Sequence, residues 1–149
     1  MTDIAFYHLE RSPLEAALPK LLEKTIAAGK RALVLAGTDA RVEALTEVLW
    51  AYDQDAWLPH GNTKDGFADQ QPIWLSVSDE NPNDATFLFL TDGAETITVP
   101  DYERCFLLFD GNDPVSVTQA RTQWKSYKDE GHQLAYWQQS VAGAWVKKE

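Results

Sequence analysis

Cysteines and basic residues are both scarce in this sequence. Cys105 is the single cysteine among 149 residues, which excludes an internal disulfide and a zinc cluster made of cysteines, and agrees with a reducing compartment. The 13 Lys and Arg residues are outnumbered by 23 Asp and Glu residues, so the formal net charge is −10. Because such a chain repels phosphate backbones, we expect no direct high-affinity binding of nucleic acid.

Long apolar runs and targeting signals are missing as well. The first residues, MTDIAFYHLE, include Asp3 and have no basic segment ahead of a long apolar stretch, so they predict neither a signal peptide nor a membrane anchor. An apolar content of 44%, with 11% aromatics, is sufficient for one hydrophobic core. We therefore expect a single domain over residues 1–149, located in the cytoplasm and without a membrane partner.

The motifs that carry catalysis or bind cofactors are also absent from the sequence. No G-x-G-x-x-G or G-x-x-x-x-G-K-[ST] loop is present to hold phosphates, and no G-x-S-x-G turn presents a nucleophilic serine. His8, His60 and His132 lack metal-ligand spacing, and Cys105 lies in an apolar run that favours a buried thiol. The sequence therefore predicts no catalytic residue, no cofactor and no metal.

Apolar runs and helical periodicities alternate along the chain. Short apolar runs predict strands at residues 4–9, 31–36, 73–77, 86–90, 104–109 and 133–138. Periodic apolar positions predict helices before Gly29, over 39–50 and over 113–130. This order is typical of a Rossmann-like α/β fold with a mixed, mostly parallel sheet flanked by helices, here without a nucleotide-binding glycine loop. Because such sheets bind ligands beyond the carboxyl ends of their strands, a small nucleotide-binding enzyme is the alternative interpretation.

The start of the first helix has its own signals. Ser12 and Glu15 have the spacing of a capping box, with Pro13 at a favourable first helical position. Pro19 predicts either a kink or a main helix that begins close to it.

Two connections between the predicted strands are also informative. The polar residues 59–72 contain glycines and charges and almost no apolar side chains, so they predict an exposed loop. The runs at 73–77 and 86–90 are too close for a full crossover helix, which favours an antiparallel pair.

The predicted helix over 113–130 carries cations on one side. Arg121, Lys125 and Lys128 are spaced i, i+4 and i+7, so these three residues, the basic stripe, lie within about 60° of one another. Trp124 lies about 60° from Arg121, between the basic stripe and the apolar positions of the helix. Either Trp124 is a core residue beside a solvated charged face, or the stripe binds an acidic peptide with an apolar end.

Three segments resemble one protein family, in the same order and at similar distances. They are FDGNDPVSVTQARTQWKSYKDEGHQLAYWQQ at 109–139, RALVLAGTDARVEALTEVLW at 31–50 and WLPHG at 57–61. The family is the chi subunit of bacterial DNA polymerase III, and the run A-R-x-x-W-K, followed by G-H and Y-W-Q-Q, is the most specific part of the match. The resemblance implies a Rossmann-like fold without nucleotide chemistry and a non-catalytic adaptor in the clamp loader of the replicase.

The resemblance also implies a partner for the basic stripe. Chi-family proteins bind the acidic C-terminal tail of single-stranded DNA-binding protein, which ends in aspartates followed by Ile-Pro-Phe. By position, Arg121 and Lys125 match the family's basic tail-binding residues, and Trp124 matches the aromatic residue between them. Lys128 extends the same stripe.

A second surface of the family docks the psi subunit, or another clamp-loader or helicase-like component. Trp50 and Trp57 match the aromatic positions of that surface, and both are equally compatible with core positions. Direct binding of single-stranded DNA through Trp and Lys side chains is a further alternative, against which the net charge argues.

Overall fold

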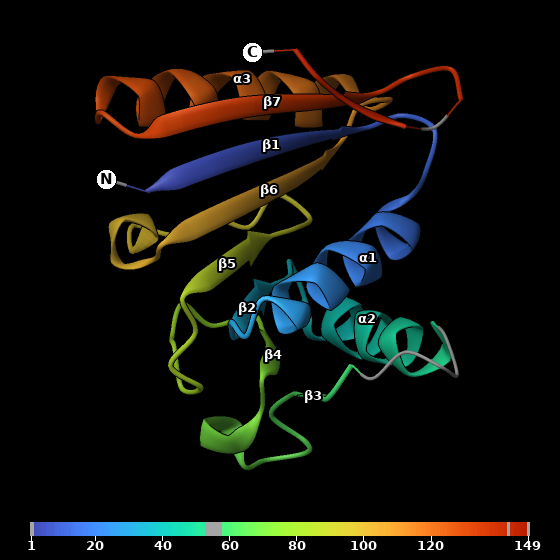
Figure 1. The fold of residues 1–149 in the computed structure, drawn as a ribbon, viewed down its shortest axis with the longest axis vertical. Helices are drawn as coiled ribbons and strands as arrows, with labels where there is room; N and C mark the ends of the chain where they lie inside the picture. Colours follow the sequence, from blue (N-terminus) through green and yellow to red (C-terminus); the bar gives the residue numbers. More distant parts are fainter. Residues whose placement is uncertain (1, 53–57, 143, 149) are drawn as a thin grey trace.

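The computed structural model describes residues 2–52, 58–142 and 144–148, and all of its strands belong to one sheet (Figure 1). The elements, with η for a 3-10 helix, are β1 (Asp3–Leu9), α1 (Leu14–Ala27), β2 (Ala32–Leu35), α2 (Asp39–Ala51), β3 (His60–Gly61), η1 (Ala68–Gln70), β4 (Ile73–Ser76), β5 (Phe87–Leu90), η2 (Val99–Asp101), β6 (Arg104–Asp110), α3 (Pro114–Asp129), β7 (Gln133–Gln139) and β8 (Trp145–Lys147). The strand order is β3-β4-β2-β5-β6-β1-β7-β8, and every pair is parallel except β7 with β8. The predicted Rossmann-like α/β fold is confirmed.

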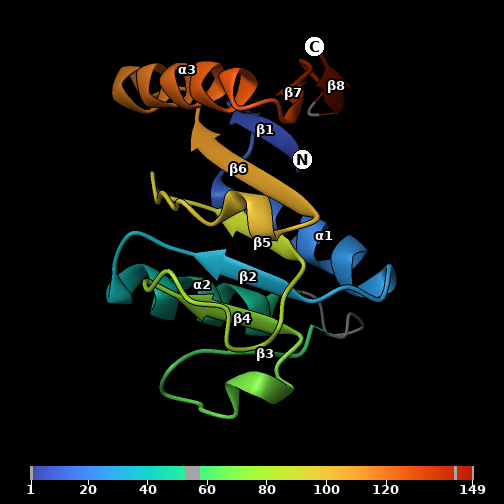
Figure 2. The ribbon, with the colours of Figure 1, turned by 90° about the vertical axis from the view of Figure 1, so that its left-hand side faces the viewer.

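The helices cover opposite faces of the sheet (Figures 1 and 2). Alternate side chains of β1 point to opposite faces: Tyr7 belongs to the hydrophobic cluster beneath α1 and α2, whereas Phe6 belongs to the cluster beneath α3. The central strands β2 and β5 are buried along their whole length, as expected for parallel strands covered on both sides.

The position of α3 follows from the strand order. β6 leads through α3 into β7, and both strands pair in parallel with β1, which lies between them. The crossover must therefore pass over β1. Asp113 begins the helix, since its side chain accepts a hydrogen bond from the backbone N–H of Val115 (3.2 Å), and Gly131, with φ +87°, follows its end.

The start of α1 differs from its prediction. The capping box is wrong: Pro13 is the N-cap residue and no side chain caps the helix there. Ser12 instead accepts a hydrogen bond from a glutamine of β7, and Glu15 forms an ion pair with an arginine of α2. A helix start near Pro19 is also wrong, because α1 is continuous from Leu14 to Ala27 and buries Pro19 within it.

The predicted antiparallel pair is wrong as well. β2 lies between β4 and β5 and pairs in parallel with both, so residues 77–86 cross the sheet without a helix. This crossover is held by Asn83, which is fully buried. Its Nδ2 group donates to the carbonyl oxygens of Ala32 and Gln71, each at 3.0 Å. The side-chain amide of Asn83 thus holds this helix-free crossover against the neighbouring strands.

The stretch 59–72 is an exposed loop only in part. Its first residues form β3, which pairs in parallel with β4, and His60 and Asn62 are buried. The ring nitrogens of His60 face the carbonyl oxygens of Leu58 (2.6 Å) and Thr46 (3.2 Å). Of the helices that the structure describes, none has the length and apolar composition needed to cross a membrane.

The role of Asn83 can be tested by substitution. Asn83→Ala removes the amide that donates to the Ala32 and Gln71 carbonyl oxygens, so we expect the free energy of unfolding to fall by about 2 kcal/mol in urea denaturation followed by tryptophan fluorescence. Asn112→Ala is the matched control, because its amide donates to a single carbonyl, that of Glu10, at the surface. The control should change stability by less than about 0.5 kcal/mol. Equal effects would contradict the assignment.

Candidate functional site

The basic stripe lies on the outer face of α3. Arg121, Lys125 and Lys128 are all exposed. The inner face of the same helix is anchored by Ala120 and Tyr127, which are buried against the sheet. Because the buried side chains fix how α3 is rotated about its axis, the three cations face solvent together.

Trp124 lies at the border between the basic stripe and the core. Its ring packs edge-on against Phe6 of β1, with centroids 5.2 Å apart, and against Tyr136 of β7, at 5.8 Å. The side chain is half-buried, so part of the ring remains accessible beside the cations. Trp124 therefore packs in the core and also contributes apolar surface next to the stripe, while binding of an acidic peptide there stays a prediction.

None of the three cations has a carboxylate within 4.0 Å among the residues that the structure describes. Arg41 shows the contrasting case, because it contacts Glu15 at 3.0 Å and Asp92 at 3.1 Å. The hydrogen bond that Arg41 donates to Asp92 is the main reason why the pKa of Arg41 is raised. Cations without internal partners are available to an anionic ligand, and they stand out in a chain of net charge −10.

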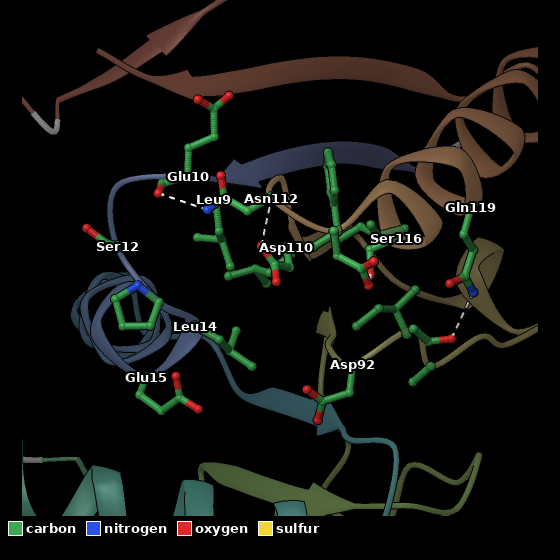
Figure 3. A pocket seen from close by; sticks show the side chains of 18 of the residues that line it. Leu9, Glu10, Ser12, Leu14, Glu15, Asp92, Asp110, Asn112, Ser116 and Gln119 are labelled. Atoms are coloured by element: carbon green, nitrogen blue, oxygen red, sulfur yellow. Dashed lines mark hydrogen bonds between the residues drawn. The ribbon is translucent and has the colours of Figure 1, made fainter. Parts of the chain in front are cut away.

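A second candidate site is a cleft of about 600 Å³ at the carboxyl ends of β1, β5 and β6 (Figure 3). This is where parallel α/β sheets bind ligands, so the cleft tests the nucleotide-binding alternative. Its walls carry five carboxylates and two guanidinium groups, those of Glu10, Glu15, Asp92, Asp110, Asp113, Arg11 and Arg41. Figure 3 shows Glu15, Asp92 and Asp110 arranged around the hollow.

The charges of this cleft disfavour a phosphate ligand. Arg41 is already engaged by two of the carboxylates. The N-terminus of α3 is capped by the carboxylate of Asp113, which occupies the place where an anion would otherwise bind. A smaller adjoining hollow of about 300 Å³ adds Asp79 and Glu95. The cleft therefore gives the nucleotide interpretation no electrostatic support.

The proposed second partner surface is described only in part. Trp50, on the last turn of α2, is 71% exposed, which settles its position in favour of the surface. Its ring lies 4.5 Å from the ring of His60, centroid to centroid. Trp57 lies outside the described residues.

The remaining groups considered for chemistry have structural surroundings. Cys105 is completely buried in β6, as its sequence predicted, and burial raises the pKa of its thiol far above the usual range, so a reactive thiolate is disfavoured. Across residues 2–52, 58–142 and 144–148, no group of three or more His, Cys, Asp or Glu side chains is arranged to hold a metal ion.

Sequence reasoning missed two aromatic residues, and one of them, Tyr136, contacts Trp124 of the candidate site. Tyr136 supports Trp124, and the alternation in QLAYWQQ places it on the α3 face of β7 together with Leu134. Phe67 is 71% exposed and has a left-handed backbone, φ +55°, which a non-glycine residue rarely adopts. No sequence pattern marks that conformation.

The comparisons with known proteins point to one family. A family model described as DNA polymerase III chi subunit, HolC, matches residues 1–135. A curated protein named "Probable DNA polymerase III subunit chi", from Rickettsia prowazekii (strain Madrid E), is 28% identical over 109 residues. This alignment covers 71% of the present chain and 66% of the relative, slightly less than two thirds of the relative's length.

The contacts of α3 separate its structural side chains from those available for binding. Trp124→Ala removes the ring that packs on Phe6 and Tyr136, so we expect the free energy of unfolding to fall by about 2–3 kcal/mol. Arg121→Ala and Lys125→Ala should each change it by less than about 0.5 kcal/mol, because neither cation has a partner in the described part of the chain. Urea denaturation followed by circular dichroism measures all three. If Arg121→Ala lowered the free energy of unfolding as much as Trp124→Ala, the basic stripe would have a role in stability.

Proposed function

Because the chain belongs to the DNA polymerase III chi-subunit family, we propose that it is a non-catalytic accessory subunit of the replicase that acts as an adaptor in the clamp loader. One surface holds the acidic tail of single-stranded DNA-binding protein. A second surface holds the psi subunit or another clamp-loader or helicase-like component. Its site of action is the cytoplasm, and its contribution is recruitment of partners rather than a reaction.

The single observation that carries this proposal is the basic stripe beside Trp124. Three exposed cations, none of which has an ion-pair partner among the described residues, lie next to a half-buried indole, in a chain whose net charge is −10. A solvated charged face does not require an aromatic ring fixed at its edge. A ligand that is acidic along its length and apolar at its end does, because it needs charge and apolar surface side by side.

The chemistry of the tail fits this arrangement. Arg121 and Lys125 pair with its aspartates and its terminal carboxylate through charge-assisted hydrogen bonds, and Lys128 adds a further cation. The terminal Phe packs on the accessible part of Trp124, whose position is fixed from below by Phe6. The cations form no ion pair with the residues at 2–52, 58–142 and 144–148, so tail binding breaks none there.

The second surface lies at the other end of the sheet. Trp50 is on α2, which covers the face opposite to α3, and it contacts His60 of the edge strand β3 (Figures 1 and 2). An indole with this exposure is typical of an interface anchor. Two partners can therefore bind without competing for the same surface.

The tail-binding site is tested by fluorescence anisotropy with a labelled acidic peptide that ends in Ile-Pro-Phe. We expect salt-sensitive binding, and Arg121→Ala or Lys125→Ala should each weaken the affinity by about tenfold or more, since each removes a charged hydrogen bond. Lys24→Ala is the matched control, because it removes the same charge from an exposed position of α1 on the opposite face.

Two results would contradict the tail-binding site. One is an equal loss of peptide affinity in Lys24→Ala, which would mean that only the net charge of the protein matters. The other is an absence of peptide binding to the unmodified protein at low salt. A labelled single-stranded oligonucleotide in the same assay tests direct DNA binding, and the net charge predicts no measurable affinity for it.

The second surface is tested by Trp50→Ala with purified psi subunit. Removal of an interface tryptophan should weaken binding at least about thirtyfold, while affinity for the tail peptide stays unchanged. Phe67→Ala is the control, because Phe67 has the same exposure of 71% and lies outside the proposed surface. Isothermal titration calorimetry measures both variants. The proposal fails if the two substitutions act equally or if Trp50→Ala has no effect.

A further inference from the structure

β8 is the edge strand of the sheet next to β7, and the sequence patterns predicted no strand for these residues. It pairs antiparallel with β7, and the register places Val146 opposite Gln138 and Lys147 opposite Trp137. The strand is the last in the sheet order and pairs with residues 137–139 of β7, directly after Tyr136, which packs beneath α3. The family model matches residues 1–135 and so does not reach β8.

The pairing continues one residue past the strand. The backbone N–H of Lys148 donates to the carbonyl oxygen of Tyr136 at 2.7 Å, which places Lys148 opposite Tyr136. Residues that face each other in an antiparallel pair project to the same side of the sheet. Tyr136 belongs to the cluster beneath α3, so Lys148 is on the α3 side as well.

Tyr136 links this lysine to the candidate site. Its ring packs on Trp124 at 5.8 Å, so the two rings form a continuous aromatic surface between α3 and β8. The basic stripe lies on the α3 side of that surface, and Lys148 lies on the β8 side. Lys148 is exposed and, in the part of the chain that the structure describes, has no carboxylate within 4.0 Å.

We propose that Lys148 forms the second wall of the peptide-binding site, so that an acidic peptide lies over Trp124 and Tyr136 with cations on both sides. This inference rests on the proposed function and extends it from one helix face to a groove between α3 and β8. Val146, which is 40% exposed and on the same side as Lys148, adds apolar surface for the hydrophobic end of the peptide. Cations on two sides fix the direction in which an acidic chain can lie, which a single stripe does not.

Lys147 provides a matched control within the same strand. It carries the same charge, is equally exposed and is adjacent in sequence. Its register partner is Trp137, which packs in the cluster on the α1 face, so Lys147 projects to the opposite side of the sheet. A difference in peptide affinity between the two alanine variants therefore depends on the side of the sheet that each lysine occupies, because both variants lose the same charge.

The test measures the affinity of the labelled acidic peptide for Lys148→Ala and Lys147→Ala at low salt. We expect Lys148→Ala to weaken binding about fivefold and Lys147→Ala less than about twofold, and Lys148→Arg to retain the original affinity. Both lysines are exposed and outside the core, so thermal unfolding of the variants should match that of the unmodified protein.

The outcomes separate this inference from the proposed function. Equal losses in the two alanine variants, or no loss in Lys148→Ala while Arg121→Ala still weakens binding, would overturn the two-sided groove and leave the tail-binding stripe in place. Absence of peptide binding to the unmodified protein would remove the proposed function, and the groove with it. A loss confined to Lys148→Ala and restored in Lys148→Arg supports the groove.

Discussion

β1 pairs in parallel with β6 on one side and with β7 on the other, and the location of the candidate site depends on this arrangement. Two parallel strands on either side of a third must be joined by a connection that passes over it, which places α3 above β1. Phe6 of β1 therefore lies beneath the helix, where it packs on Trp124. Ala120 and Tyr127, which are buried against the sheet, fix the rotation of α3, and that rotation in turn directs Arg121 and Lys125 to solvent.

The charges of the molecule are separated by position. Carboxylates gather at the carboxyl ends of the parallel strands, where the two hollows share Asp92. Exposed cations that have no carboxylate within 4.0 Å in the described part of the chain lie on α3 and at the end of β8. A phosphate ligand is disfavoured where this fold class ordinarily binds one, because Asp113 caps the helix N-terminus that would receive it. The sheet thus has the architecture of a nucleotide-binding fold, but the exposed cations lie on the outer face of α3 and not at the carboxyl ends of the strands.

Features that depend on local patterns could be predicted from the sequence. The apolar runs predicted six of the eight strands that the structure describes, all except β3 and β8. Gly29 and Gly131 marked the helix ends, since both adopt positive φ there. The spacing of Arg121, Lys125 and Lys128 was sufficient to place them on one helix face. Strand order was not predictable for β4 and β5, because the contact that determines it, from Asn83 to Ala32 and Gln71, joins residues distant in sequence. The pairing of β8 with β7 was missed for a similar reason: Trp145–Lys147 is too short for its alternation to be distinguished from chance.

The proposed adaptor role depends on the separation of the two proposed partner surfaces. α3 with β8 and Trp50 with β3 lie at opposite ends of the strand order, so a partner on one does not cover the other. A rigid sheet joins the two ends, and its central strands are buried on both faces, so the distance between the surfaces stays nearly constant. When both are occupied, the second partner is held at a high effective concentration near the first, and weak contacts at each end combine into a much stronger linkage. The proposed adaptor needs two separated contact surfaces, and the two candidates for them lie at opposite ends of the strand order.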